Sequence, residues 1–255
     1  MEDRESSKLD HYSSGTLEDR ESSKLDHYSS GTLEDRESSK LDHYSSGRAC
    51  SARGNEKNMD KQKIKKAVKM ILEAIGENPD RQSLRKTPSR VAEMYEELFS
   101  GLSFPAPGGL LKVLPAEKNE GTVIVRNIPF YSMCEHHLLP FFGKAHIAYM
   151  PYKKVAGLSK FARLVDVIAA RPQVQERITR QIASFIWESL QPRGIFVLIE
   201  ATHFCMTMRG IKKDGSSVVT TCGKGIFANK KTQSGIISLM VHATYYKNDK
   251  SNKMG

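Results

Sequence analysis

The chain has 255 residues, with 39 lysines and arginines against 29 aspartates and glutamates and a formal net charge of +10. This length suits one or two globular domains, and four cysteines are too few for a disulfide scaffold. No apolar run approaches the roughly 18 residues of a membrane span, and the start Met-Glu-Asp-Arg-Glu is unlike a secretory signal. We therefore expect a soluble cytoplasmic protein.

An internal repeat occupies the N-terminus. Residues 2–17 read EDRESSKLDHYSSGTL, residues 18–33 repeat them unchanged, and residues 34–47 repeat all but the last two positions. Each copy is charged and rich in serine, so stacked copies cannot bury a core, and we predict a disordered low-complexity tail over residues 1–48. The rest of the chain has 32 basic and 17 acidic side chains, a net charge of +15. This excess favours an anionic partner: nucleic acid, a membrane surface or a phosphorylated small molecule.

The remaining pattern predicts helices first and a mixture of strands and helices afterwards. A helix is expected from the N-cap Asp60 to Gly76 and another from Thr87 to Gly101, within an N-terminal helical region of residues 49–110. In residues 111–255, strand-like stretches at 122–128 and 144–150 precede two antiparallel helices over 159–172 and 174–190. Strand patterns at 194–201 and 217–227 and an alternating stretch at 235–246 follow. This order predicts an α+β fold with a largely antiparallel sheet and helices on one face.

A metal site is indicated by Cys134 and His137, three positions apart, with Cys205 arriving 68 residues after the histidine. Sulfur and imidazole together select zinc, and three protein ligands without an obvious fourth are typical of a catalytic site that keeps one position open for water. A buried cysteine beside a structural histidine is an equally frequent explanation of such a pair. Two further histidines, His136 and His203, adjoin these residues and are candidate acid–base groups.

Phosphate binding is predicted at the start of the first central helix, although no P-loop motif is present. Ser159, Lys160 and Arg163 lie where free backbone amides and the helix dipole assist cations in holding phosphate, and Arg209 adds a guanidinium four residues after Cys205. Taken singly, each of these four residues is more often solvated on the surface. Their proximity to the metal motif is what supports a role in phosphate binding.

Base recognition is the functional interpretation of Gln175 and Glu176, at the start of the second central helix. A carboxylate accepts two hydrogen bonds from the N1–H and 2-amino edge of guanine. The alternative is that Glu176 only complements the helix dipole.

Three segments resemble GTP cyclohydrolase I: SMCEHHLLPFFGKAHIAYMP (132–151), GLSKFARLVDVIAARPQVQER (157–177) and EATHFCMTMRG (200–210). The resemblance covers residues 60–227 and implies the tunnelling fold, with residues 111–255 as the catalytic domain. It implies opening of the guanine imidazole ring of GTP, loss of C8 as formate and formation of 7,8-dihydroneopterin triphosphate. It also implies a zinc ion held by Cys134, His137 and Cys205.

The resemblance implies roles for the remaining candidates. His203 would protonate N7, His136 would be a second acid–base group near the ribose, and Glu176 and Gln175 would hold the guanine. The triphosphate would face basic and hydroxyl side chains, namely Ser159, Lys160, Arg163, Arg209 and Arg90. Ser159 is also counted as catalytic. Arg90 would reach the triphosphate of a neighbouring subunit in a toroidal decamer. Departures from the family pattern at Cys222 and Lys224 and after residue 232 concern terminal packing and subunit contacts more than chemistry.

Two alternatives to an active enzyme remain at this point. A basic zinc module that binds nucleic acid would need a closed four-ligand site, for which Cys222 is the candidate fourth ligand. A catalytically inactive regulatory subunit is disfavoured because every matched catalytic residue is present. The enzyme interpretation predicts GTP as substrate, no nucleic-acid or membrane partner, and room for a feedback-regulatory protein. The sequence does not distinguish folate from tetrahydrobiopterin synthesis as the destination of the product.

Overall fold

The computed structural model describes residues 59–104, 110–117 and 121–248, with side chains up to residue 240. The predicted tail over residues 1–48 lies outside the described residues, as does Cys50. All the described residues belong to the unit Asn55–Gly255. Within them, no helix has both the length and the apolar character needed to cross a membrane.

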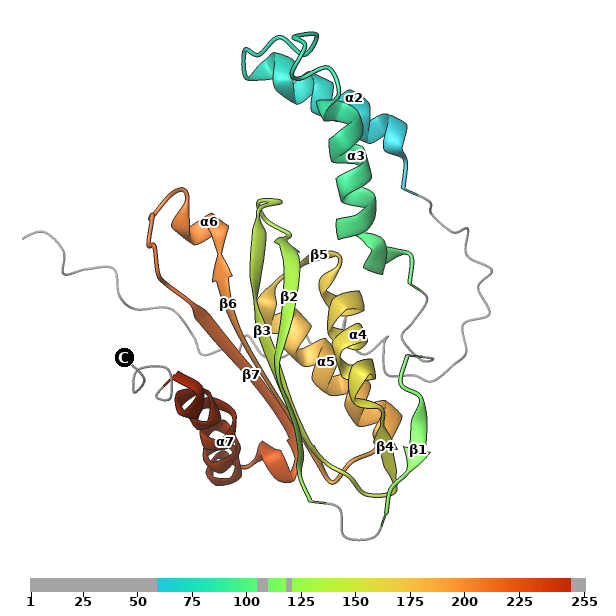
Figure 1. Ribbon diagram of the computed structural model, residues 1–255, viewed down its shortest axis with the longest axis vertical. Helices are drawn as coiled ribbons and strands as arrows, with labels where there is room; N and C mark the ends of the chain where they lie inside the picture. The colour runs from blue at the N-terminus through green and yellow to red at the C-terminus, as the bar shows by residue number, and fades with distance from the viewer. Residues whose placement is uncertain (1–58, 105–109, 118–120, 249–255) are drawn as a thin grey trace, which may run out of the picture. The chain divides into compact units, whose positions relative to one another are not determined.

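The N-terminal part of this unit is helical, as predicted, with α2 (Lys61–Ala74), α3 (Thr87–Leu98) and the short η2 (Ser100–Leu102) (Figure 1). Asp60 caps α2, since its carboxylate accepts a hydrogen bond from the backbone N–H of Lys63 at 3.0 Å. Gly101 joins this part to the rest: its N–H donates to the carbonyl of Ala170 at 2.9 Å. A Cβ at position 101 would lie 2.3 Å from the carbonyl oxygen of Val167, so only glycine allows this approach.

A five-stranded sheet forms the body of the unit (Figure 1). Its spatial order is β5 (Pro172–Gln173), β2 (Val123–Cys134), β3 (Pro140–Met150), β6 (Gly194–His203) and β7 (Val218–Gly225). Neighbouring strands are antiparallel except for the short parallel pair of β5 with β2. A separate two-stranded sheet pairs β1 (Val113–Pro115) with β4 (Lys154–Ala156). The predicted α+β class with a largely antiparallel sheet is confirmed.

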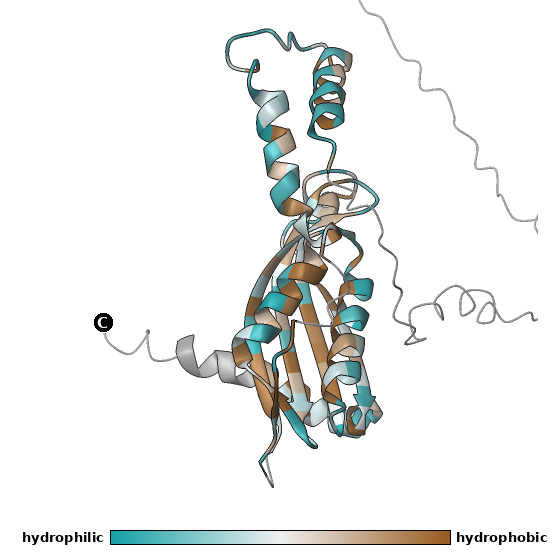
Figure 2. Ribbon diagram, turned by 90° about the vertical axis from the view of Figure 1, so that its right-hand side faces the viewer, coloured by the Kyte–Doolittle hydropathy of each residue, from teal (hydrophilic) through white to brown (hydrophobic). Residues whose placement is uncertain are grey.

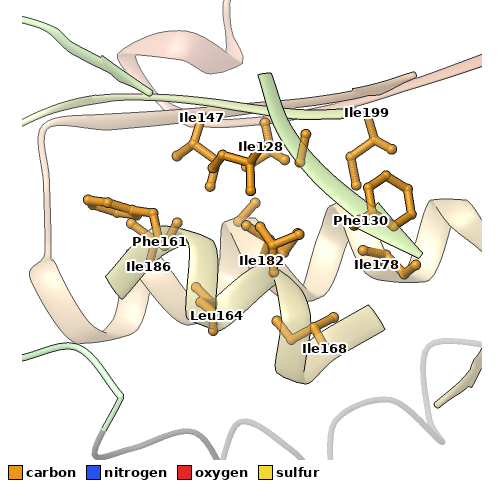
Figure 3. Packing of buried hydrophobic residues seen from close by; sticks show 14 of the residues in the cluster. Ile128, Phe130, Ile147, Phe161, Leu164, Ile168, Ile178, Ile182, Ile186 and Ile199 are labelled. Atoms are coloured by element: carbon orange, nitrogen blue, oxygen red, sulfur yellow. The ribbon is translucent and has the colours of Figure 1, made fainter. Parts of the chain in front are cut away.

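The main core lies between this sheet and two helices, α4 (Leu158–Ala169) and α5 (Gln175–Leu190). Fully buried isoleucines recur every four residues along α5, which gives the helix one apolar face toward the sheet. Alternate residues of the strands meet them, and Figure 2 shows the strands as largely hydrophobic. The residues in contact across this layer are shown in Figure 3 and include Ile128, Phe130, Ile147, Phe161, Leu164, Ile178, Ile182 and Ile186.

One element differs from the prediction. The alternating stretch at 235–246 is not a strand: it lies in the helix α7 (Lys230–Asn248), which follows the short η4 (Ile226–Ala228). Ile236 and Met240, four residues apart, are buried together against Phe196 and Leu198 of β6. The spacing of a helix therefore places these apolar residues on one buried face, although their alternation in the sequence suggested a strand. Since α7 covers the face opposite α4 and α5, the helices do not all lie on one face (Figure 1).

The strand register brings distant parts of the sequence to one end of the sheet. Phe141 of β3 is opposite His203 of β6, and Cys134 at the end of β2 is paired with Gln173, just before α5 begins. The short helix α6 (Phe204–Thr207) follows β6 directly. The ends of three strands and the start of α5 therefore surround one position, where the candidate site lies.

Candidate metal centre and active site

Three potential metal ligands converge at this end of the sheet, as the sequence predicted. Cys134 closes β2, His137 lies in the turn that leads to β3, and Cys205 lies in α6. The sulfur atoms and a ring nitrogen of these residues all lie within 4.8 Å of one another, and Sγ of Cys134 is 3.6 Å from Nδ1 of His137. The turn is closed by hydrogen bonds from the N–H of Cys134 to the carbonyl of Leu139 and from the N–H of Leu138 to the carbonyl of Cys134, both at 2.8 Å.

The chemistry of this donor set fits a zinc ion. Burial, followed by the neighbouring Cys134 thiol, raises the pKa of the Cys205 thiol. Two thiolates this close repel each other, so a divalent cation between them would stabilise both in the deprotonated form. Cys222 does not belong to the group: it lies in β7, and burial raises the pKa of its thiol. Among the described residues, the centre offers three ligands and no fourth cysteine.

His203 lies beside the ligands at the end of β6 and is held from two directions. Its ring stacks on that of Phe141 with a centroid distance of 4.5 Å and an interplanar angle of 5°. Its Nε2 is 2.8 Å from Oε1 of Gln175. Burial lowers the pKa of His203, and the negative charge of Glu176 partly opposes this shift. An uncharged imidazole in a fixed orientation is therefore the resting form at neutral pH.

Gln175 fixes which nitrogen of His203 carries the proton. The glutamine is 1% exposed, and its amide nitrogen faces the carbonyls of Ile199 at 3.1 Å and Val218 at 2.9 Å and the hydroxyl of Thr220 at 3.1 Å. With the amide nitrogen directed to these acceptors, the amide oxygen must face His203. Nε2 of the imidazole is then the donor, and Nδ1 is the nitrogen left to exchange a proton. The carboxamide of Gln175, which was predicted to hold guanine, is thus in contact with His203, another predicted site residue.

Other predicted residues lie on the surface around the centre. Glu176 is exposed in the first turn of α5, and its charge acts on His203. Arg209 is exposed just after α6, where its charge lowers the pKa of Cys205 against the larger effects that raise it. His136 is exposed in the metal turn, with Nε2 at 3.9 Å from a carboxylate oxygen of Glu135.

The predicted phosphate-binding residues of α4 lie toward the start of that helix, whereas its end leads to the centre. Ser159, Lys160 and Arg163 lie in the first two turns of α4, which follow β4. It is the last turn of the helix that leads to β5, beside Cys134. With a rise of about 1.5 Å per residue, the two ends of this helix are roughly 16 Å apart. Arg90 is exposed in α3.

Sequence reasoning missed an ion pair next to the metal ligands. Arg177 in α5 donates to both carboxylate oxygens of Glu135, at 2.5 and 3.0 Å. Glu135 immediately follows the candidate ligand Cys134, and Arg177 immediately follows Glu176. The one indication of this ion pair in the sequence is that each residue adjoins a predicted site residue. Nothing in the sequence shows that the turn after β2 and the helix α5 are in contact.

Comparison with known proteins decides the family. The family model described as GTP cyclohydrolase I matches residues 64–241. A protein named GTP cyclohydrolase 1 from Carboxydothermus hydrogenoformans is 58% identical over 186 residues, which are 72% of this chain and 96% of that protein. One of the same name from Clostridioides difficile is 61% identical over 171 residues, 66% of this chain and 90% of that protein. The chain belongs to the GTP cyclohydrolase I family.

Membership of the GTP cyclohydrolase I family confirms the predicted resemblance and the prediction of an enzyme. The matched region spans both the N-terminal helices and the sheet, and it contains all three potential ligands. The alternative of a nucleic-acid-binding zinc module required a closed four-ligand site, and the described residues offer three ligands.

Proposed function

We propose that the chain is a zinc-dependent GTP cyclohydrolase I that converts GTP and water to 7,8-dihydroneopterin triphosphate and formate, the first step of pterin biosynthesis. The observation that carries the proposal is the position of Cys134, His137 and Cys205 beside a histidine already held by a hydrogen bond. Metal ligands and an oriented acid–base group at the same place are what a hydrolysis at a carbon between two nitrogens requires.

Cys134, His137 and Cys205 are the residues that would hold zinc. When bound in such a site, zinc lowers the pKa of water toward neutrality and polarises oxygen atoms of the substrate. In the resting imidazole the single proton is on Nε2, which donates to Gln175, so Nδ1 of His203 first takes up a proton from water and then transfers it to N7 of guanine. Protonation of N7 withdraws electron density from C8 and makes that carbon susceptible to attack by water.

The other side chains bind and orient the nucleotide. The carboxylate of Glu176 accepts hydrogen bonds from the N1–H and the 2-amino group of guanine, and Gln175 acts on the same base through His203. His136, exposed on the metal turn, serves as the acid–base group near the ribose. Arg209, just after α6, faces the triphosphate.

A second copy of the chain completes the site in this proposal. Ser159 and Lys160 lie in the first turn of α4, at the end of the helix opposite the one that leads to Cys134 of their own chain, and Arg163 lies one turn further along. Placed against the centre of a neighbour, they would supply hydroxyl and cationic groups for the triphosphate, joined by Arg90 from α3. Such sharing accords with the tunnelling fold and a toroidal decamer.

The test is one incubation of purified full-length protein with GTP. Release of formate, appearance of a pterin chromophore and about one zinc per chain are expected. Cys205→Ser should lose both the metal and the activity, because a two-ligand site binds zinc far more weakly. Full zinc occupancy in Cys205→Ser, or no formate from the parent protein, would overturn the proposal.

A further inference from the structure

The turn that carries two of the three metal ligands is tied to α5 by the Glu135–Arg177 ion pair. Both guanidinium nitrogens Nη1 and Nη2 of Arg177 donate, each to a different carboxylate oxygen of Glu135. The planar two-bond geometry of this pair fixes direction as well as distance.

The anchor on the α5 side is itself held in place. The backbone N–H of Glu135 donates to the carbonyl of Gln173 at 3.0 Å, next to the side-chain pair. Gln173 is 1% exposed, and its amide nitrogen donates to the carbonyl of Ile168 at 3.0 Å and to Oε1 of Gln181 at 2.9 Å. The Arg177 guanidinium also reaches Oε1 of Gln173 at 3.4 Å. Glu135 is thus fastened to a buried network that spans α4 and α5.

Packing does little to hold the outer part of the same turn. His136, His137 and Leu138 are all exposed, although His137 is one of the ligands. The turn must nevertheless keep Cys134 and His137 in register with Cys205, which comes from a different element. Hydrogen bonds, and not burial, therefore determine the position of His137 relative to the sheet.

We propose that Glu135 and Arg177 are positioning residues that preorganise the metal centre and couple it to the start of α5. The inference rests on the zinc-dependent function proposed above. One segment, residues 173–177, holds the metal turn through Gln173 and Arg177 and holds His203 through Gln175. The metal ligands and the acid–base histidine are thereby fixed relative to each other by the same five residues.

The experiment uses the zinc-loaded full-length protein and three variants. Arg177→Met removes the charge and the fork but keeps an apolar stem, Arg177→Lys keeps the charge without the fork, and Glu135→Gln keeps the shape without the charge. The matched control is Arg81→Met, which breaks another arginine fork: Nε and Nη2 of Arg81 donate to one oxygen of Glu77 at 3.2 and 2.8 Å, between α2 and α3.

Three measurements separate positioning from folding. Zinc affinity is measured by competition with a chromophoric chelator in the absence of GTP, and the visible spectrum of the cobalt-substituted protein reports ligand geometry. Formate release gives kcat and KM. We expect Arg177→Met to bind zinc about 10- to 100-fold more weakly, as is usual when a group that orients metal ligands is removed. Its cobalt spectrum should change and its kcat should fall more than its KM rises, Arg177→Lys should be intermediate, and Arg81→Met should match the parent.

Zinc affinity and a cobalt spectrum equal to the parent's in folded Arg177→Met would overturn the inference. If Arg177→Met does not fold by circular dichroism, Glu135→Gln is judged by the same two measurements and the same outcome. Failure of the proposed function is distinguishable, because it would appear in the parent as absence of zinc or of formate release. A parent that binds zinc and releases formate, together with an unaffected Arg177→Met, contradicts the role of the pair alone.

Discussion

Replacing Gln175 by leucine tests the hydrogen-bond network that orients His203. The leucine has a similar volume but removes the donor that faces Ile199 and Val218 and the acceptor that faces His203. Because the site is 1% exposed, water does not replace the lost partners. Thr220 keeps the hydroxyl of Thr179 at 2.7 Å as a partner, so two backbone carbonyls carry most of the loss.

The expected magnitude follows from those two carbonyls. A buried polar group that loses its partner costs about 1–3 kcal/mol, and burial of the more apolar leucine offsets part of the sum. We expect the free energy of unfolding of Gln175→Leu to fall by about 2–4 kcal/mol. The kcat for formate release should fall by about 10- to 100-fold, since a general acid must be positioned to contribute its full effect. Zinc content should stay at the parental value, because no ligand is touched.

The assays are urea unfolding followed by circular dichroism and formate release, both at matched protein concentration because assembly affects apparent stability. Gln233→Leu is the matched control: its amide nitrogen donates to the carbonyl of Phe227 at 2.9 Å in a partly exposed position at the start of α7. It should lose less stability and keep its kcat. Parental kcat and parental stability in Gln175→Leu would refute the role assigned to this network.

Three further predictions concern other residues. Glu176→Ala should lose use of GTP by orders of magnitude with zinc still bound, whereas Arg163→Ala should mainly raise the KM for GTP with a strong salt dependence; steady-state kinetics at two salt concentrations compare them. Cys222→Ser should keep zinc and activity, because Cys222 lies outside the ligand group, and metal loss comparable to that of Cys205→Ser would show a closed four-ligand site. Asp166 is exposed in α4, and partial desolvation of its carboxyl raises its pKa, so it makes a small contribution to stability that is fully present below the unfolded value near 3.8 and is lost as the pH rises through the higher folded value. Asp166→Asn should therefore be more stable than the parent at neutral pH, and the difference measured by urea unfolding should shrink as the pH falls toward 3.8.

Local patterns in the sequence were sufficient for the elements that depend on nearby residues. The apolar stripe and cap at Asp60 predicted α2, and the four-residue spacing of isoleucines predicted α5. The donor types of Cys134, His137 and Cys205 indicated a zinc site because sulfur and imidazole suit that ion, although their convergence depends on the pairing of β6 with β3. The two helix predictions use local spacing, which does not depend on strand register.

What the sequence did not reveal depends on register and on packing between distant elements. The partners of Gln175 lie in β6 and β7, and the pairing of those strands decides which carbonyls it meets. The apolar residues near Ile236 are compatible with strand or helix, and contact with Phe196 and Leu198 settles the choice as a helix. The distance of Arg163 from the ligands likewise follows from the direction in which α4 runs, which no spacing in the sequence gives.

The ligands are unequally distributed along the chain, and this has a consequence for biosynthesis. Cys134 and His137 emerge from the ribosome early, but Cys205 reaches them only when β6 has paired with β3, opposite Phe141. During translation at about 5–20 residues per second, a nascent chain spends several seconds with two ligands out of three. We expect such a chain to hold zinc too weakly to compete with cellular chelators, so that metal capture follows completion of the central sheet. A newly made chain then binds zinc only after it has folded, and incomplete chains do not deplete cellular zinc.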